Sequence, residues 1–181
     1  MAAYLISGRS GTGKSTVYKE LIRRGFIAYD SDTVPGLASW VDIATERKIN
    51  KDYPGHDQVD KFKVKWDEET LKELLKQPDT VFICGSANNA FDFMPLFTKT
   101  FVLDLEAAEQ RRRINNRTEH DYGKDSGVQD GIIAYQKETV AHAREFGAII
   151  IDASDRVEHV TNKILSFVTP TGNNSSHTQK A

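Results

Sequence analysis

Short apolar runs alternate with longer amphipathic segments along most of the chain. The apolar runs are rich in β-branched and aromatic residues and do not alternate with polar ones, which is typical of strands covered on both faces. Strands are therefore predicted at residues 3–7, 26–29, 80–84, 100–103 and 148–151. Because helical patterns separate these runs, the sequence predicts an α/β fold with a five-stranded parallel sheet.

The amphipathic segments predict the helices. The first places Val17, Leu21 and Ile22 on one side and ends at Gly25, which fits the residue just after a helix C-terminus. Apolar residues at helical spacing predict further helices at 68–76, 106–117, 131–146 and 155–167. Each predicted helix adjoins a predicted strand, as expected for helices that cover the faces of a sheet.

Three segments fall outside this pattern. Residues 35–66 and about 117–128 are long and irregular, and such loops in a compact domain are often functional, here an acceptor-binding insertion and a lid. Surface decoration is the alternative for both. Residues 169–181 are polar and lack periodicity, so we expect a disordered tail after a single domain at 1–168.

Composition narrows the class of protein without naming a function. Lys plus Arg is 24 and Asp plus Glu is 26, so the formal net charge of −2 argues against a bulk nucleic-acid binder. No apolar run approaches the roughly 18 residues of a membrane span, and the N-terminus lacks the pattern of a signal peptide. The lone Cys84 cannot form an internal disulfide, as is usual in a reducing cytoplasm, which is the predicted location.

The strongest motif lies between the first strand and the first helix. Residues 8–15, Gly-Arg-Ser-Gly-Thr-Gly-Lys-Ser, satisfy G-x-x-x-x-G-K-[ST], the phosphate-binding loop or P-loop. Its glycines let backbone N–H groups point at an anion, and the following helix presents its own free N–H groups. Lys14 adds positive charge for the β- and γ-phosphates, and the Ser15 hydroxyl is suited to bind Mg²⁺. The predicted nucleotide-binding residues are Gly8, Ser10, Gly11, Thr12, Gly13, Lys14, Ser15 and Thr16.

A pair of carboxylates follows the second strand. Asp30 and Asp32 stand at i and i+2, so in extended geometry both point toward the carboxyl edge of the sheet, beside the P-loop. One carboxylate is suited to hold a Mg²⁺-bound water, and the other to position or deprotonate an attacking hydroxyl. The alternative is a polar turn after a strand. The adjacent P-loop favours the chemical role.

The order of P-loop, helix, strand and Asp-x-Asp resembles the P-loop small-molecule kinases, the superfamily of shikimate kinase, adenylate kinase and gluconate kinase. This resemblance implies a three-layer P-loop NTPase fold that binds ATP and Mg²⁺. By the resemblance to shikimate kinase, Asp32 contacts the acceptor and Asp30 lies on the metal side. The third strand is not followed by the Asp of a Walker B motif, which disfavours motor ATPases and most GTPases.

A second resemblance concerns the segment before the predicted lid. Residues 113–117, Arg-Ile-Asn-Asn-Arg, resemble the helix end that precedes the lid in nucleoside monophosphate kinases. Because residues at i and i+4 share one helix face, the two arginines are suited to meet one anionic ligand. The resemblance implies Arg113 over the adenine and Arg117 at the transferring phosphoryl group, with Lys124 adding charge when the lid closes. A solvated basic face is the alternative, and Arg111 is expected at the surface.

Acceptor-binding residues are also predicted outside the Asp pair. Gly85, Ser86 and Asn88 follow the third strand, where some of these kinases place an acceptor loop, and Trp40 is suited to stack on a nucleobase or to fill the core. The predicted reaction is Mg²⁺-dependent transfer of the ATP γ-phosphoryl group to a small acceptor, with a nucleoside or nucleotide favoured. Alternatives are a hydroxy acid, a sugar, a polynucleotide 5′-end, or nucleotide-binding regulation without transfer. The motifs do not distinguish ATP from GTP or define an oligomeric state.

Overall fold

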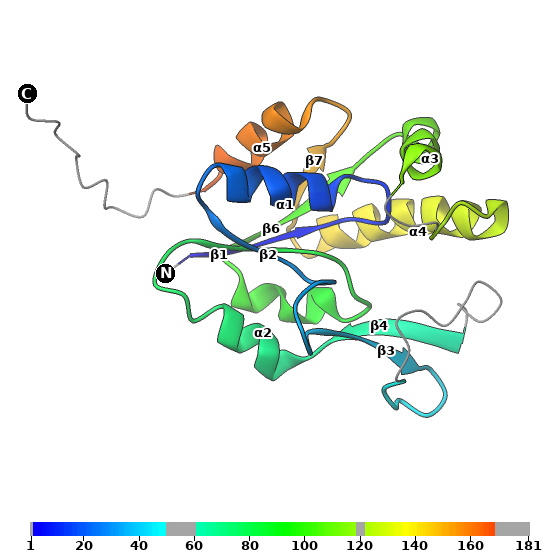
Figure 1. Cartoon of the computed structure of the whole chain (residues 1–181), viewed down its shortest axis with the longest axis horizontal. Coiled ribbons are helices and arrows are strands. Elements are labelled where there is room, and N and C mark those ends of the chain that lie inside the picture. The colour runs from blue at the N-terminus through cyan, green and yellow to red at the C-terminus, as the bar shows by residue number, and fades with distance from the viewer. Residues whose placement is uncertain (1, 50–60, 119–121, 169–181) are drawn as a thin grey trace, which may run out of the picture.

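A computed structural model describes residues 2–49, 61–118 and 122–168 of the chain. Its main sheet consists of β1 (Ala3–Ser7), β2 (Ile27–Asp30), β5 (Val81–Cys84), β6 (Lys99–Asp104) and β7 (Ile149–Asp152). These strands are all parallel and stand in the order β2-β5-β1-β6-β7 (Figure 1). Each begins and ends within one residue of a predicted strand, so the α/β class and the five-stranded parallel sheet are confirmed. The predicted tail, the middle of the predicted lid and most of the loop within the insertion lie outside the described residues.

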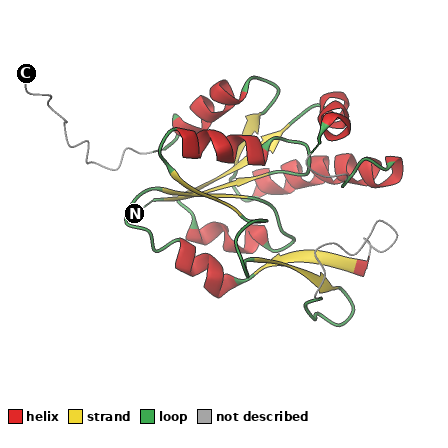
Figure 2. Ribbon diagram, in the orientation of Figure 1, coloured by secondary structure: helices red, strands yellow, loops and turns green. Residues whose placement is uncertain are grey.

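Successive side chains of a strand point to opposite faces of the sheet, and here both faces are buried. In β1, Tyr4 and Ile6 lie in one apolar cluster together with Phe82, whereas Leu5 lies in a second cluster with Ile83. The Tyr4 ring stacks on Phe82 with 5.3 Å between the ring centroids. Strands without polar alternation therefore need helices on both faces, and the fold has three layers (Figure 2).

Helices cover the two faces of the sheet. They are α1 (Lys14–Arg23), α2 (Glu68–Leu74), the 3₁₀ helix η2 (Ala90–Leu96), α3 (Ala107–Asn116), α4 (Ser126–Glu145) and α5 (Val157–Leu165). Side chains of α1 and α5 pack in the cluster around Tyr4, and those of α2, η2 and α4 pack on the opposite face. Figure 1 shows α1 and α5 together on one side of the sheet and α2 on the other. In α3, the Ile114 side chain approaches the P-loop at Gly11.

The helix α4 begins at Ser126, earlier than the predicted residue 131. The side chain of Asp125 accepts hydrogen bonds from the backbone N–H groups of Gly127 at 3.0 Å and Val128 at 3.3 Å. This N-cap satisfies donors that the first turn leaves free, which outweighs the low helix propensity of glycine. The last residues of the predicted lid are therefore the first turn of α4.

The predicted irregular insertion contains a second, two-stranded sheet. Its antiparallel strands are β3 (Ala38–Asp42) and β4 (Phe62–Trp66), with Trp40 opposite Val64. Trp66 anchors the hairpin because its side chain is 3% exposed and lies in the cluster that contains Leu5. Because β3 ends at Asp42 and β4 begins only at Phe62, the two strands are too far apart in the sequence for the short loop that usually signals a hairpin.

Gly85 follows β5 at a position where a side chain does not fit. A Cβ there would lie 1.9 Å from the hydroxyl of the fully buried Ser31 and 3.1 Å from Trp66 Cζ2. We expect Gly85→Ala to lower the free energy of unfolding by about 1–3 kcal/mol, because overpacking displaces its neighbours. Chemical denaturation measures the loss.

The matched control is Gly131→Ala within α4, where nothing lies within 4 Å of the Cβ position. Alanine there is expected to raise the free energy of unfolding by about 0.5–1 kcal/mol, since it favours the helix more than glycine does. Equal losses in the two variants would contradict the packing explanation for Gly85.

Candidate nucleotide and acceptor site

A large cleft opens at the carboxyl edge of the main sheet, where the loops after β1, β2, β5 and β7 meet. Its volume is about 2550 Å³. This is well above the roughly 300–1,000 Å³ of an ordinary ligand pocket, so the cleft has room for two small molecules. The P-loop, the start of α5 and the β3–β4 hairpin all line it, and Figure 1 shows α5 and the hairpin on opposite sides of the sheet. Two ligands, one bound at each end of the cleft, would therefore meet at the P-loop.

The P-loop turns tightly because three of its residues adopt backbone angles that favour glycine. Gly8, Gly11 and Gly13 have φ of 140°, 84° and 103°. A Cβ on Gly8 would lie 2.9 Å from the carbonyl oxygen of Leu103, and one on Gly11 would lie 2.7 Å from Ile114 Cγ1. Glycine is therefore needed both for the turn and for the close approach of the loop to β6 and α3.

Lys14, the first residue of α1, lies at the floor of the cleft beneath the loop. Its ammonium donates a 3.1 Å hydrogen bond to the carbonyl of Arg9, which also accepts one from the Thr12 hydroxyl at 2.8 Å. Burial lowers the pKa of Lys14 to about 8, although the carboxylates of Asp32 and Asp30 act to raise it. A desolvated ammonium that faces a cleft gains most from an anionic ligand, so this geometry suits a nucleotide phosphate.

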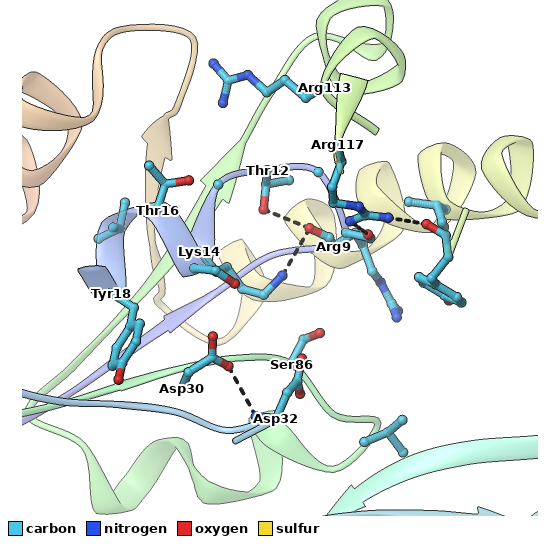
Figure 3. A pocket seen from close by; sticks show the side chains of 18 of the residues that line it. Arg9, Thr12, Lys14, Thr16, Tyr18, Asp30, Asp32, Ser86, Arg113 and Arg117 are labelled. Atoms are coloured by element: carbon cyan, nitrogen blue, oxygen red, sulfur yellow. Dashed lines mark hydrogen bonds between the residues drawn. The ribbon is translucent and has the colours of Figure 1, made fainter. Parts of the chain in front are cut away.

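Asp30 and Asp32 lie across the cleft from Lys14 (Figure 3). The Asp32 N–H donates to Asp30 Oδ1 at 3.2 Å, and the Ser31 hydroxyl donates to Asp32 Oδ1 at 3.2 Å. Residues 30–33 thus form a turn at the end of β2 that keeps both acidic residues in the lining of the cleft. The polar turn and the facing carboxylates, which were alternatives in the sequence, occur together.

Ser15 and Thr16, the predicted Mg²⁺ ligand and its neighbour, are exposed in the first turn of α1 and line the same cleft. Thr12 differs from them, because it is fully buried and its hydroxyl is used within the loop. The predicted nucleotide-binding residues are therefore brought together, with Thr12 shaping the loop from inside.

The two arginines of the predicted lid motif point to different places. Arg113 Nη2 donates to the carbonyl of Ala153 at 2.9 Å, just before α5. Arg117 Nη1 donates to the hydroxyl of Ser10 at 3.0 Å, and its Nη2 donates to the carbonyl of Tyr122. The side chains diverge because α3 ends before Arg117, whose backbone is extended. Arg113 thus lies at the α5 end of the cleft, and Arg117 joins the P-loop to the segment before α4.

Of the neighbouring basic residues, Arg112 also lines the cleft, whereas Arg111 and Lys124 are not part of its lining. Arg111 donates to Asp130 at 2.6 Å and so links α3 to α4, in keeping with its expected surface position. Arg112 pairs with Glu109 at 2.6 Å within α3, and Lys124 is exposed.

The predicted acceptor residues lie at the hairpin end of the cleft. Trp40 lines this end from β3, together with Phe62 and Val64 from β4. Gly85 packs against Ser31, while the residues after it, 86–88, line the cleft. The acceptor end therefore combines an aromatic and apolar wall with a polar loop.

Asn88 and Asn89 hold the hairpin in place, a role that the sequence did not reveal. Asn88 Oδ1 accepts a hydrogen bond from the N–H of Val64 at 3.0 Å, and Asn89 Oδ1 accepts one from the N–H of Trp66 at 2.9 Å. The side-chain amide of Asn89 also donates to the carbonyl of Trp66 at 3.0 Å. The loop after β5 thereby acts as an extra partner for the edge of β4.

Membrane-spanning helices and clusters of metal-binding side chains are both absent from the described residues. Over the ranges that the structure covers, none of the helices combines the length and apolar character of a membrane span. In the same ranges, no three or more His, Cys, Asp or Glu side chains gather in a way suited to a metal ion.

The fold and the cleft define a P-loop NTPase fold of the kinase-like type. The P-loop stands between β1 and α1 of a five-stranded parallel sheet. Residues 5–134 match the family model described as an AAA domain, which is well over half of the chain, so the chain belongs to this family of P-loop proteins. No curated protein matches the sequence.

Solved kinases share this fold at low sequence identity. Shikimate kinase from Bacteroides thetaiotaomicron is 17% identical, with a TM-score of 0.56 and coverage of 91% of this chain and 97% of that chain. Shikimate kinase from Acinetobacter baumannii, in complex with shikimate, is 16% identical, with a TM-score of 0.58 and coverage of 92% of each chain. Deoxyadenosine kinase from M. mycoides, with dCMP and dCDP bound, is 15% identical, with a TM-score of 0.52 and coverage of 91% and 96%. The predicted resemblance to P-loop small-molecule kinases is thus confirmed in the fold.

The depressed pKa of Lys14 predicts a pH dependence of nucleotide binding. The charged ammonium is the form that binds phosphate, and in the free protein it is lost as the pH rises through about 8. We expect the Kd for a non-hydrolysable ATP analogue to be constant near neutral pH and then to rise, approaching about tenfold per pH unit. Isothermal titration calorimetry over this pH range measures it. Lys14→Arg is the control, because its guanidinium stays charged; the same pH profile in both proteins would contradict the assignment to Lys14.

Proposed function

We propose that this protein transfers the γ-phosphoryl group of ATP to a hydroxyl group of a small acceptor, with a nucleoside or nucleotide favoured. The observation that carries the proposal is the placement of Lys14 opposite Asp30 and Asp32 in one cleft large enough for two ligands. A P-loop that only bound a nucleotide would not need a second compartment with its own carboxylates. The proposed location is the cytoplasm, where a lone cysteine such as the buried Cys84 is usual.

The donor nucleotide is assigned to the P-loop and the α5 end of the cleft. Its β- and γ-phosphates lie against the P-loop with Lys14, and its adenine lies near Arg113, which also bonds the carbonyl of Ala153. Mg²⁺ commonly keeps several waters and takes one or two protein oxygen ligands beside the phosphates. The Ser15 hydroxyl and the Asp30 carboxylate fit that donor set. When bound, the ion would neutralise charge on the phosphates.

The acceptor is assigned to the space between Asp32 and the hairpin. Its hydroxyl oxygen forms a new bond to the γ-phosphorus while the bond from that phosphorus to the β-phosphate oxygen breaks and ADP leaves. The hydroxyl proton passes to the Asp32 carboxylate. Lys14 and Arg117 offset the negative charge on the transferred phosphoryl oxygens.

The walls of the acceptor end favour a flat ring. Trp40 and Phe62 present aromatic surface, and Ser86 and Asn88 add hydrogen-bonding groups on the other side. Aromatic rings stack on bases, and polar groups then fix the orientation. The Mycoplasma deoxyadenosine kinase, which shares the fold, was solved with deoxynucleotides bound. This combination supports a nucleoside or nucleotide over a sugar.

Two substitutions separate nucleotide binding from transfer. Lys14→Ala is expected to abolish ATP turnover, because it removes the charge that holds the phosphates. Asp32→Asn is expected to leave ATP affinity within about twofold and to slow transfer by about 10²–10⁴-fold, since an amide cannot accept the proton. Calorimetry for binding and product formation for transfer check the two effects.

Asp79→Asn is the matched control, because Asp79 is an exposed carboxylate outside the cleft. It is expected to leave both binding and transfer unchanged. Wild-type transfer rates in the Asp32→Asn protein would show that Asp32 has no role in the transfer step.

The decisive experiment is incubation of the protein with γ-labelled ATP and a panel of acceptors. The panel contains nucleosides, nucleotides, sugars, hydroxy acids and an oligonucleotide with a free 5′-hydroxyl. A labelled nucleoside or nucleotide product is expected. A product from another class would redirect the acceptor assignment, and no product from any class would favour nucleotide-binding regulation without transfer.

A further inference from the structure

The P-loop carries a second basic side chain, Arg9, in the position after its first glycine. The consensus of the motif places no requirement on this residue. Arg9 lines the cleft and is half-buried. Its carbonyl accepts hydrogen bonds from Lys14 and Thr12 and so helps to fix the shape of the loop. Its side chain points away from the loop toward α4.

Three residues on one stretch of α4 contact Arg9, two through its side chain and one through its backbone N–H. Its Nε donates to the Thr139 hydroxyl at 2.9 Å, and its guanidinium carbon lies 5.4 Å from the centroid of the Tyr135 ring. Its backbone N–H donates to Gln136 Oε1 at 3.0 Å. The Gln136 amide, 2% exposed, in turn donates to the carbonyl of Leu103 at 2.9 Å. The base of the side chain is therefore positioned from several sides.

The outer edge of the same guanidinium is left for a ligand. In the part of the chain that the structure describes, its two Nη nitrogens make no hydrogen bond and no carboxylate pairs with it. Glu138 is exposed and acts on it only through space, and burial lowers the pKa of Arg9. A half-buried cation without a counterion is costly, and an anion entering the cleft would offset that cost.

The position of Arg9 in the cleft indicates which anion its guanidinium would bind. Arg9, Arg117 and Tyr122 all line the same cleft, and the charges of both arginines oppose the rise that burial causes in the pKa of Tyr122. Arg117 also bonds Ser10, the residue next to Arg9 in the loop. Figure 3 shows both arginines on the same side of Lys14. Their common neighbourhood is the P-loop itself, where the terminal phosphate of ATP would lie.

We propose that Arg9 is a second catalytic arginine, whose free Nη groups bind the non-bridging oxygens of the transferred phosphoryl group together with Arg117. This inference rests on the kinase function proposed above. Arg9 forms no covalent bond and takes no proton. Its part is to offset charge that grows on these oxygens as the phosphoryl group passes from ADP to the acceptor hydroxyl. A planar guanidinium held at Nε presents its remaining N–H groups in a fixed direction, which suits phosphate oxygens.

A merely structural role for Arg9 makes a different prediction. If it only ties the P-loop to α4, its loss would loosen the whole loop and weaken ADP and ATP alike. Thr139→Val tests this role separately, because it removes the hydrogen bond to Nε but keeps the charge. We expect Thr139→Val to change nucleotide affinity by less than about threefold.

The test measures the Kd of Mg²⁺–ADP and of Mg²⁺ with the β,γ-imido analogue of ATP for the full chain and for Arg9→Gln. The wild-type protein is expected to bind the analogue more tightly than ADP. In Arg9→Gln the ADP affinity stays within about twofold, while the preference for the analogue falls by about ten- to a hundredfold, the scale of lost charge-assisted hydrogen bonds. Arg9→Lys is expected to restore part of the preference. The matched control is Arg111→Gln, because the Arg111 side chain pairs with Asp130 outside the cleft. This variant is expected to keep the preference for the analogue over ADP.

Three results would overturn the proposal. One is a parallel loss of ADP and analogue affinity in an Arg9→Gln protein with an unchanged melting temperature, which would show a structural role. Another is an unchanged preference with a raised acceptor KM, which would place the anion on the acceptor. The third is wild-type behaviour in every measurement. Because the binding assay needs neither acceptor nor turnover, its failure is distinct from the failure of the kinase function, which is the absence of any product from the acceptor panel.

Discussion

The desolvation of one ammonium group shapes the cleft. Lys14 lies under the P-loop with its charge directed at the carbonyl of Arg9, and burial holds its pKa near 8. The loop can close over it because glycine at Gly8, Gly11 and Gly13 permits the turn. The parallel sheet then brings the end of β2 to the same edge, where two carboxylates act on the ammonium through space. Loop, sheet order and acid pair are thus arranged around one buried cation.

Beside the P-loop, basic and acidic groups of the cleft lie on different segments of the chain, a separation that the formal net charge of −2 for the whole chain conceals. Basic groups lie on the P-loop and the segments that contact it, with Arg117 bonded to Ser10. The acidic pair Asp30 and Asp32 lies on the β2 side, and the other acidic residues of the lining, Asp125, Asp155 and Glu158, belong to the ends of α4 and α5. A phosphoryl group moving between two ligands would pass between these regions. The separation follows from where strands end in a parallel sheet.

The helix α4 connects parts of the site that are distant in the sequence. Its N-cap, Asp125, ends the segment that Arg117 contacts at Tyr122, and its middle holds Arg9 through Gln136 and Thr139. One rigid element therefore contacts both the P-loop and the chain that precedes α4. Any movement of α4 when a nucleotide binds would therefore displace both the P-loop and the segment before α4.

The sequence by itself determined the core strands, the P-loop and the acid pair, because each is written in neighbouring residues: an apolar run, a spaced set of glycines, two carboxylates at i and i+2. The helix cap and the pairing of distant segments could not be predicted from the sequence. The start of α4 depends on the single side chain of Asp125, and β3 and β4 find each other across a long loop, with Asn88 and Asn89 supporting the edge. Only the tertiary structure decided where Arg9 points, since its partner Thr139 lies 130 residues away. Local patterns record what a segment buries, whereas contacts between distant segments are decided by how the whole chain packs.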